Sequence, residues 1–336
     1  MNKVIILLGP TGVGKTGVSL LLAKSLNTEI ISADSMQIYR HMDIGTAKPT
    51  PAERKNVRHH MVDVAEPWET YSTGKYIAAV RTIIEDLRRR RKIPIIVGGT
   101  GLYIRAMTRG IFSGPSADWT LREELLAMER EVNGTLYSSL QMLDPDSAAK
   151  ITPRDTRRIT RALEVCIRSS SRMSDMQKNL TRPLPYDYVK IGITRDRKEL
   201  YRLIEDRVDN MMKAGLAEEV KMVMQLITEH AGAQDAECSA QDKKNRESRF
   251  TVNALPSMQA IGYKEILSHF RDEIPLDEAV TLIKKASKRY AKRQFTWFKK
   301  EDDVVWVDIT GIKDPNTILD KLYPIIAKTI RIGEPS

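Results

Sequence analysis

Short apolar runs recur along the chain and alternate with longer segments whose apolar residues follow helical spacing. A short apolar run bounded by turn residues is typical of a strand buried on both faces, and strands that alternate with helices favour a parallel sheet. The sequence therefore predicts an α/β fold, a parallel sheet flanked by helices. The predicted strands are 3–8, 29–33, 93–97, 188–193 and an edge strand at 304–307, and the main flanking helices are 16–26, 72–87, 199–214 and 277–297.

The strand signal stops in the middle of the chain and returns later. Helical periodicity there predicts helices at 118–132, 135–143 and 153–169. A helical block between two strands of one sheet indicates an inserted all-helical domain that could swing as a lid. A polar, aperiodic stretch at 230–250 suggests a flexible surface loop. The expected division is a core of 1–114 and 186–310, an insertion of 115–185, and a C-terminal helix or tail of 311–336.

Composition narrows the class of protein. The 336 residues carry a formal net charge of +10, which favours a polyanionic partner without specifying a fold. The two cysteines, Cys166 and Cys238, form no C-x-x-C pair, so a disulfide scaffold and a cysteine-rich zinc site are excluded. No apolar run is long enough to span a membrane, and the N-terminus makes a poor signal peptide. We expect a cytoplasmic monomer.

The first predicted strand leads directly into a phosphate-binding loop of the form G-x-x-x-x-G-K-[ST]. Its glycines let backbone N–H groups surround phosphate oxygens, and the helix that follows presents its positive N-terminal end to the same charge. Lys15 would reach the phosphates, and the Thr16 hydroxyl would help to hold Mg²⁺. The expected phosphate ligands are Gly9, Pro10, Thr11, Gly12, Val13, Gly14, Lys15 and Thr16.

Two further polar positions follow predicted strands. Asp34 comes after the second strand, where a carboxylate faces the ligand crevice of a parallel sheet. It is either a residue supporting a magnesium ion or a general base. Thr100 follows Gly98-Gly99 at the end of the third strand. An NTP-hydrolysing protein often has an acidic residue there, whereas Thr100 can donate a hydrogen bond to a leaving oxygen without activating water. The absence of an acidic residue at this position argues against an ordinary ATPase.

Basic residues gather on one side of two predicted helices. In the insertion, four arginines share an arc of about 100° on a 3.6-residue helix, opposite an apolar side. In the helix 277–297, two rows of cations repeat at i,i+4. Both faces could follow a phosphate backbone, and a solvated face is the alternative interpretation. The arginines are Arg154, Arg157, Arg158 and Arg161, and the rows are Lys284, Lys288 and Lys292 beside Lys285, Arg289 and Arg293.

Taken together, the motifs resemble one family, the tRNA dimethylallyltransferases, also called isopentenyltransferases. They lie in that family's order and cover nearly the whole chain. The departures are 169–173, which is usually richer in Gly, Lys and Pro, and 230–250, which looks extended. The motifs are GPTGVGKT (9–16), ISADSMQIYRHMDIGTAKP (31–49), RHHMVDV (58–64), VGGTGLY (97–103), RDTRRITRALEV (154–165), QAIGYKE (259–265) and AKRQFTWF (291–298).

The resemblance implies a reaction: a dimethylallyl group moves from dimethylallyl diphosphate to N6 of the adenine 3′-adjacent to the anticodon of a tRNA. Asp34 would then be the general base for the N6 proton. Mg²⁺, Lys15 and Arg207 would stabilise the departing diphosphate, with Thr100 on the bridging oxygen. Arg207 is assigned only from its place in IEDRVDNMM, which resembles an arginine-bearing helix of the family. The family fold also implies a channel through the core for the allyl diphosphate.

The same resemblance implies contacts with the tRNA anticodon stem-loop. Residues 34–37 would recognise the target adenine and its neighbour, and three other segments would hold the RNA. The implied contacts are Asp34, Ser35, Met36, Gln37, Arg157, Arg158, Ile159, Thr160, Arg161, Gln259, Gly262, Tyr263, Lys264, Lys288, Arg289, Lys292, Arg293 and Gln294.

Three alternatives remain. An adenylate isopentenyltransferase would use the same electrophile with free AMP, ADP or ATP, but would not need the basic helices. A nucleotide kinase shares the phosphate loop and a helical lid, and would turn over ATP. A non-catalytic RNA-binding protein would have no need of Lys15, Thr16, Asp34 and Thr100 together. The family's eukaryotic members often add a C-terminal zinc finger, and the absence of such spacing here favours a bacterial-type cytoplasm.

Overall fold

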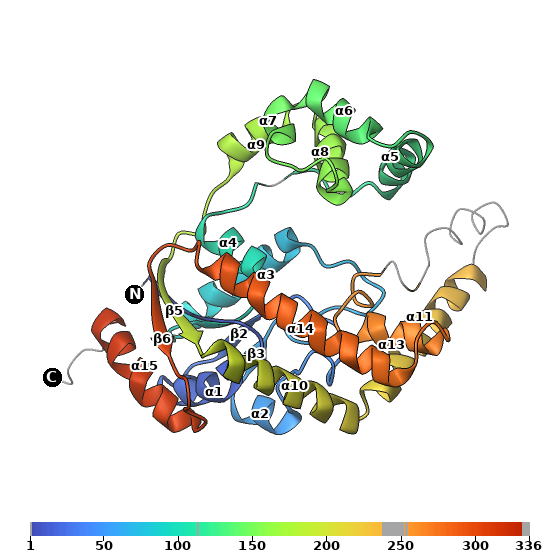
Figure 1. The fold of residues 1–336 in the computed structure, drawn as a ribbon. Coiled ribbons are helices and arrows are strands. Elements are labelled where there is room, and N and C mark those ends of the chain that lie inside the picture. The colour runs from blue at the N-terminus through green and yellow to red at the C-terminus, as the bar shows by residue number, and fades with distance from the viewer. Residues whose placement is uncertain (1, 113, 237–251, 253–254, 331–336) are drawn as a thin grey trace. The chain divides into compact units, whose positions relative to one another are not determined.

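A six-stranded parallel sheet forms the centre of the fold in the computed structural model, which describes residues 2–112, 114–236, 252 and 255–330 (Figure 1). The order across the sheet is β3-β2-β4-β1-β5-β6, so β1 is flanked on both sides, and its residues Val4–Leu8 are fully buried. The predicted α/β class with a parallel sheet is confirmed. The strands are β1 Lys3–Leu8, β2 Ile30–Ala33, β3 His59–His60, β4 Ile95–Gly98, β5 Asp187–Thr194 and β6 Val304–Asp308.

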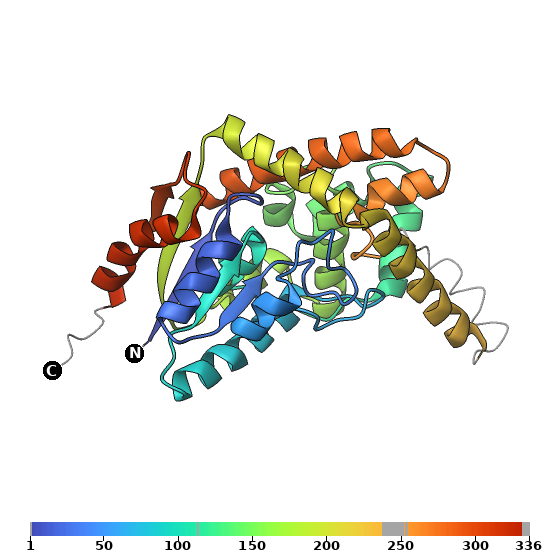
Figure 2. The same cartoon turned by 90° about the horizontal axis from the view of Figure 1, so that it is seen from below.

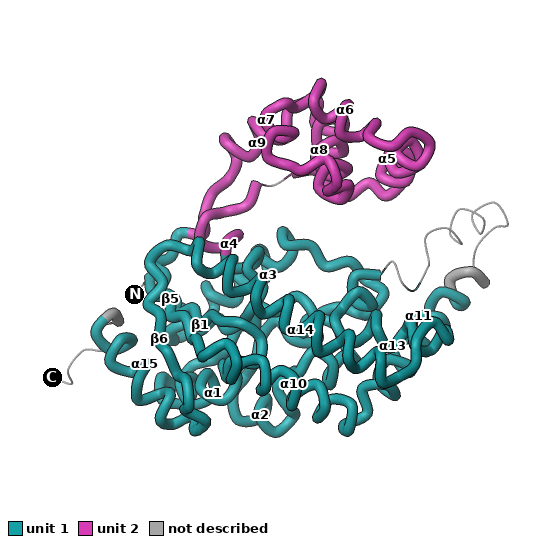
Figure 3. Tube along the Cα trace, in the orientation of Figure 1, with its two compact units in different colours: residues 1–104, 185–336 teal, residues 105–184 magenta. Residues whose placement is uncertain are grey.

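The chain divides into two compact units, residues 1–104 with 185–336, and residues 105–184 (Figure 3). Within the first unit, α10 runs beside α14 and α1 beside α15 (Figure 2). Outside the second unit the helices are α1 Lys15–Ser25, α2 Pro51–Asn56, α3 Thr73–Arg89, α4 Gly101–Thr108 (which reaches into the second unit), α10 Arg197–Lys213, α11 Leu216–Ala236, α13 Tyr263–Phe270, α14 Leu276–Phe298 and α15 Pro315–Ile330; the second contains α5 Trp119–Glu131, α6 Thr135–Leu143, α7 Pro145–Ala148, α8 Thr156–Ser169 and α9 Met173–Leu180.

Apolar clusters among the described residues hold these elements together, and three of them matter for the site and for the second unit. The first joins the sheet to α1 and α15, so the segment after residue 310 is part of the core packing. The second joins α11, α13 and α14 to the loop after β2, and the third holds the second unit together. Representative members are Ile5, Leu7, Val18, Leu22, Leu322 and Ile326 of the first, Ile38, Met42, Val223, Tyr263 and Ile283 of the second, and Leu125, Leu140, Ile159 and Leu163 of the third.

Caps account for several helix starts. The Ser72 hydroxyl accepts the N–H of Lys75 at 3.2 Å at the start of α3, as its position in the sequence suggested. Asp155 accepts the N–H of Arg158 at 3.2 Å, so α8 begins three residues later than the predicted start at 153.

Two expectations need correction. Residues 230–236 belong to α11, so the predicted loop at 230–250 is wrong for its first part, and 237–250 lie outside the described residues. Helix α2 was not predicted, because it buries no residue and shows no apolar periodicity; a capping box between Thr50 and Glu53 defines it instead. Among the described helices, none combines the length and apolar character needed to cross a bilayer.

We predict that Gly98→Ala destabilises the sheet. Gly98 pairs with Ala33 across β4 and β2, and a Cβ at position 98 would lie 2.2 Å from the Ala33 carbonyl oxygen. Backbone on both sides has little freedom to move, so urea denaturation should show a loss of about 1–3 kcal/mol in the free energy of unfolding. Gly232→Ala, in α11 with no atom within 4 Å of its added Cβ, should instead gain about 0.5–1 kcal/mol. Equal stabilities for the two variants would contradict this account.

Candidate active site

The phosphate-binding loop connects β1 to α1, as its sequence predicts. Gly14 precedes α1 with a φ of 107°, a conformation that side chains other than glycine rarely adopt. The helix therefore starts at Lys15, one residue before the predicted start, with its N-terminal N–H groups directed at the loop.

Lys15 is half-buried beneath this loop, and its ammonium donates hydrogen bonds of 2.8 Å to the carbonyls of Gly9 and Pro10. Burial lowers the pKa of Lys15 from 10.5 to about 7; the nearby Arg207 cation adds to this effect and Asp34 opposes it. The charge on Lys15 thus responds to any anion placed in the loop.

Asp34 and Thr100 meet at the carboxyl edge of the sheet. One Asp34 oxygen, Oδ1, accepts the N–H of Met36 at 2.8 Å and that of Gln37 at 3.4 Å, which fixes the orientation of the carboxylate. The Thr100 hydroxyl oxygen accepts the N–H of Ser35 at 3.0 Å and also lies 3.4 Å from the Ser35 hydroxyl. Thr100 therefore supports the turn that carries Asp34.

Arg207 of α10 reaches the same place, as the family resemblance implied. Its Nη1 donates to the Thr11 hydroxyl at 3.2 Å, and burial lowers the pKa of its guanidinium. Tyr290 of α14 is also near: burial, with the Asp34 charge second, raises the pKa of its phenol.

Two cavities, both within the first unit, are lined by Asp34 and Arg207. The first, of about 270 Å³, is lined by the phosphate-binding loop, the ends of β2 and β4, and the loop after β2. The second, of about 310 Å³, is lined by α10, α14 and residues 259–264. Thr11, Asp34, Thr46 and Arg207 line both, whereas Thr100 is among the lining residues of neither. A carboxylate thus lies where a phosphate chamber meets a second chamber.

The side chains at the first cavity fit a magnesium ion that is held mainly by phosphate. Thr16 lines the cavity with its exposed side chain, and the Asp34 carboxylate lines it too. Within the described part of the chain, His, Cys, Asp and Glu form no group of three able to hold a metal alone. Mg²⁺ commonly needs only one or two protein oxygens when substrate phosphates and water supply the rest.

Several residues expected to contact RNA have buried side chains, and for them the expected contact stays a prediction. Gln294 is 5% exposed; its Oε1 accepts the Thr11 N–H and its Nε2 donates to the Gly99 carbonyl, each at 2.8 Å. Tyr263 is 0% exposed, and Ile159 and Thr160 pack inside the second unit. The i,i+4 pair of Tyr290 and Gln294 on an otherwise apolar helix face was the signal that could have revealed this role.

Other expected contacts remain at the surface, with fewer free charges than predicted. Arg157 and Arg158 are exposed, but Arg158 pairs with Asp155 and Arg161 pairs with the buried Glu164. On α14 the row of Lys284 and Lys288 pairs with Asp209 and Glu205 of α10. Exposed cations persist in Lys285, Arg289, Lys292 and Arg293, while Gln259, Gly262, Lys264 and Arg293 line the second cavity.

The phosphate-binding loop between β1 and α1 of a parallel sheet defines a P-loop protein, and Asp34 lines both cavities. The chain matches the family model described as IPP transferase over residues 37–301, and it belongs to that family. The protein of Thermodesulfovibrio yellowstonii named tRNA dimethylallyltransferase is 53% identical over 98% of this chain and 99% of its own length. The Bacillus subtilis protein of the same name is 43% identical over 98% of each chain.

Solved structures agree with this membership. The tRNA isopentenylpyrophosphate transferase of Bacillus halodurans is 36% identical, with a TM-score of 0.67 over 98% of this chain and 97% of its own. A eukaryotic dimethylallyltransferase, described as acting on tRNA, is 28% identical, with a TM-score of 0.80 over 100% of this chain and 81% of its own.

We predict that diphosphate binding weakens as the pH rises above the pKa of Lys15. The free protein holds this proton only below about pH 7, and a bound anion favours the charged lysine, so binding above that pH takes up a proton. Calorimetry with inorganic diphosphate from about pH 6 to about pH 9 should show affinity falling by up to about tenfold per unit above the pKa. Lys15→Arg keeps its charge over this pH range and should remove the pH dependence that Lys15 causes. Parallel affinity profiles for the wild type and Lys15→Arg would contradict this prediction.

Gln294 provides a second test, because its contacts are with the loop and not with solvent. Gln294→Met leaves the Thr11 N–H and the Gly99 carbonyl without their partner, and diphosphate affinity should fall about tenfold. RNA affinity should stay within about twofold in a filter-binding assay, since the side chain is buried. Arg293→Gln, on the exposed face of the same helix, should show the opposite pattern. Weaker RNA binding in Gln294→Met alone would restore the contact expected from the sequence.

Proposed function

We propose that this protein transfers a dimethylallyl group from dimethylallyl diphosphate to N6 of the adenine 3′-adjacent to the anticodon of tRNA and releases diphosphate. The observation that carries this proposal is the shared lining of the two cavities by Asp34, Thr11, Thr46 and Arg207. A diphosphate in the loop would place its allyl carbon toward the acceptor chamber, with the carboxylate at the junction.

Asp34 has the geometry of a general base. Its Oδ1 is engaged by backbone N–H groups, and no hydrogen bond within the described chain occupies Oδ2. The N6 lone pair of adenine is delocalised into the ring, so the amine becomes a good nucleophile only as its proton leaves. In the proposed step N6 attacks the allyl carbon, the carbon–oxygen bond to diphosphate breaks, and the N6 proton moves to Asp34.

The departing diphosphate gains negative charge, and this chain supplies cations where that charge grows. Lys15 would leave the Gly9 and Pro10 carbonyls for the phosphate oxygens, and Arg207 lies beside Thr11 of the same loop. Thr100 lines neither cavity as it stands, so it would reach the bridging oxygen only by turning from its long 3.4 Å contact with the Ser35 hydroxyl. Mg²⁺ bound through the Thr16 hydroxyl and the diphosphate would add further charge neutralisation.

The exposed cations of α14 support a polyanionic acceptor. Lys285, Arg289, Lys292 and Arg293 are exposed, and Arg293 also lines the second cavity, so a phosphate backbone following this face would bring a base to the chamber. A base in a folded RNA loop must be turned out of its stack to enter. The names of its relatives include tRNA as the substrate, and we extend the proposal to a cytoplasmic monomer that acts on the anticodon stem-loop.

Labelled dimethylallyl diphosphate with Mg²⁺ and either unmodified tRNA or AMP tests the acceptor. Label should enter tRNA only. We predict that Asp34→Asn lowers transfer by about two to four orders of magnitude, the range for a lost general base. Its affinity for inorganic diphosphate should stay within about threefold, because Lys15, Arg207 and the loop are intact. Label on AMP alone, or phosphate transfer from ATP, would contradict the proposed function. Near-normal turnover in Asp34→Asn would show that Asp34 is not the general base.

A further inference from the structure

The loop of residues 42–49, between β2 and α2, forms a wall of both cavities. Thr46 lines both of them, Ala47 and Pro49 line the first, and Gly45 lines the second. The loop contains no helix or strand of its own. Whatever holds this loop therefore sets the shape of both chambers.

Glu219 of α11 holds the loop from behind. Its carboxylate is buried and accepts four hydrogen bonds: Oε2 from the N–H groups of Asp43 at 2.8 Å and Ile44 at 2.7 Å, and Oε1 from Gly45 at 2.9 Å and the Tyr263 hydroxyl at 2.5 Å. Three successive N–H groups converging on one carboxylate form an anion-binding nest whose anion is part of the protein. Glu219 itself is not a lining residue of either cavity.

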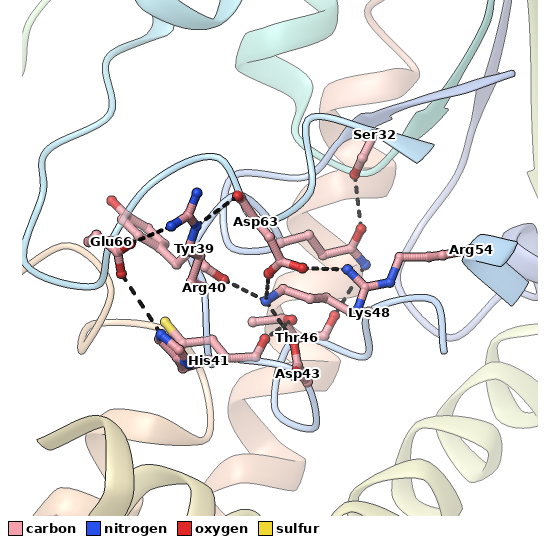
Figure 4. A network of polar contacts seen from close by, with 12 residues as sticks. Ser32, Tyr39, Arg40, His41, Asp43, Thr46, Lys48, Arg54, Asp63 and Glu66 are labelled. Carbon is pink, nitrogen blue, oxygen red and sulfur yellow. Dashed lines mark hydrogen bonds and ion pairs between the residues drawn. The ribbon is translucent and has the colours of Figure 1, made fainter. Parts of the chain in front are cut away.

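Lys48 fixes the other end of the loop (Figure 4). Its ammonium donates to the Tyr39 carbonyl at 2.5 Å, to Asp43 Oδ1 at 2.8 Å and to Asp63 Oδ1 at 2.6 Å, which uses all three of its protons. Asp63 also pairs with Arg54. Burial alone would raise the pKa of the Asp63 carboxyl, but the hydrogen bonds from Lys48 and Arg54 outweigh it and lower that pKa.

The loop is connected to the proposed base through Gln37. The Gln37 side-chain amide donates to the carbonyls of Thr46 at 3.3 Å and Ala47 at 3.2 Å, and its carbonyl accepts from Ser32 at 2.9 Å. The backbone N–H of the same residue lies 3.4 Å from Asp34 Oδ1. Hydrogen bonds, joined by the backbone of the loop and by Gln37 itself, thus connect Glu219 to the Asp34 carboxylate.

Tyr263 connects Glu219 to the acceptor side as well. It is the first residue of α13 and follows 259–262, which line the second cavity. Its ring is fully buried, and its hydroxyl donates to the same carboxylate that binds Gly45. One carboxylate therefore joins the loop to the wall of the acceptor chamber.

We infer that Glu219 is a positioning residue for the transfer reaction, which fixes the loop 42–49, and through Gln37 the Asp34 carboxylate, relative to the acceptor wall. This inference rests on the proposed function. A misplacement of about 1 Å at a reacting group can cost about a hundredfold in rate, so a residue outside both cavities can control turnover.

The test is Glu219→Gln, with Glu218→Gln as the matched control, because Glu218 lies on the same helix with an exposed side chain. The amide offers one acceptor oxygen in place of two and turns a donor toward an N–H group. We predict that kcat for transfer to tRNA falls by about ten- to a hundredfold, while inorganic diphosphate affinity stays within about twofold and Glu218→Gln matches the wild type. Amide hydrogen exchange at residues 43–45 should accelerate in Glu219→Gln and nowhere in the sheet.

A double-mutant cycle separates positioning from general destabilisation. If Glu219 acts through Asp34, Glu219→Gln should cost no more than about threefold in an Asp34→Asn background, whereas a purely structural role costs the same factor in both backgrounds. Tyr263→Phe removes one of the four hydrogen bonds and keeps the ring, so it should lower kcat for transfer less than Glu219→Gln does. It replaces Glu219→Gln in this test if that variant does not fold.

The outcomes distinguish this inference from the proposal beneath it. A wild-type protein that labels no tRNA contradicts the proposed function, and the inference with it. Wild-type transfer that survives unchanged in Glu219→Gln, or equal losses with and without Asp34, overturns the inference alone.

Discussion

The site depends on two half-buried basic side chains, Lys15 and Arg207, that share one nearby carboxylate, Asp34. Burial lowers the pKa of both Lys15 and Arg207, and Arg207 lowers that of Lys15 further, while Asp34 opposes the shift in each. Charge removed from water in this way is costly unless an opposite charge compensates it. In the proposed function, a bound diphosphate would supply that opposite charge.

Such an arrangement requires a scaffold that does not relax around the cations. The carbonyls of Gly9 and Pro10 hold Lys15, and the Thr11 hydroxyl holds Arg207. Gln294 in turn ties the Thr11 N–H to the Gly99 carbonyl. From the opposite side, the Arg195 guanidinium donates to the Val13 carbonyl at 3.0 Å. These contacts are mostly with backbone groups, which keeps the loop open without neutralising it.

The sequence predicted what depends on local pattern. Apolar runs located the strands, and the phosphate-binding loop and Asp34 were recognisable because strand, loop and helix follow one another. The α14 cations were harder: their i,i+4 spacing indicated a free face, yet Glu205 and Asp209 of α10 pair with Lys288 and Lys284. The spacing of residues along one helix shows which side chains share a face, but it does not show which charged residues of a neighbouring helix will pair with them.

The roles of Gln294 and Glu219 escaped sequence reasoning for the same physical reason. Gln294 binds backbone groups of residues 11 and 99, and Glu219 binds those of 43–45, so their partners are backbone atoms far away along the chain. Every residue has backbone N–H or carbonyl groups, so the residue types in the sequence do not indicate which of these groups a distant side chain will bind. Family resemblance supplied Arg207, but it also placed buried Tyr263 and Gln294 among the RNA contacts.

The Arg195 side chain has a consequence for the order in which the protein matures. Besides Val13 it binds the carbonyls of Ile309 at 3.0 Å and Ile312 at 2.5 Å. The phosphate-binding loop is therefore supported by residues near 195, 294 and 310, which the ribosome adds after the loop. Chains grow from the N-terminus at about 5–20 residues per second. A nascent chain holding only the loop and first helix has none of that support, so the loop reaches its supported conformation only after the residues near 195, 294 and 310 have been made.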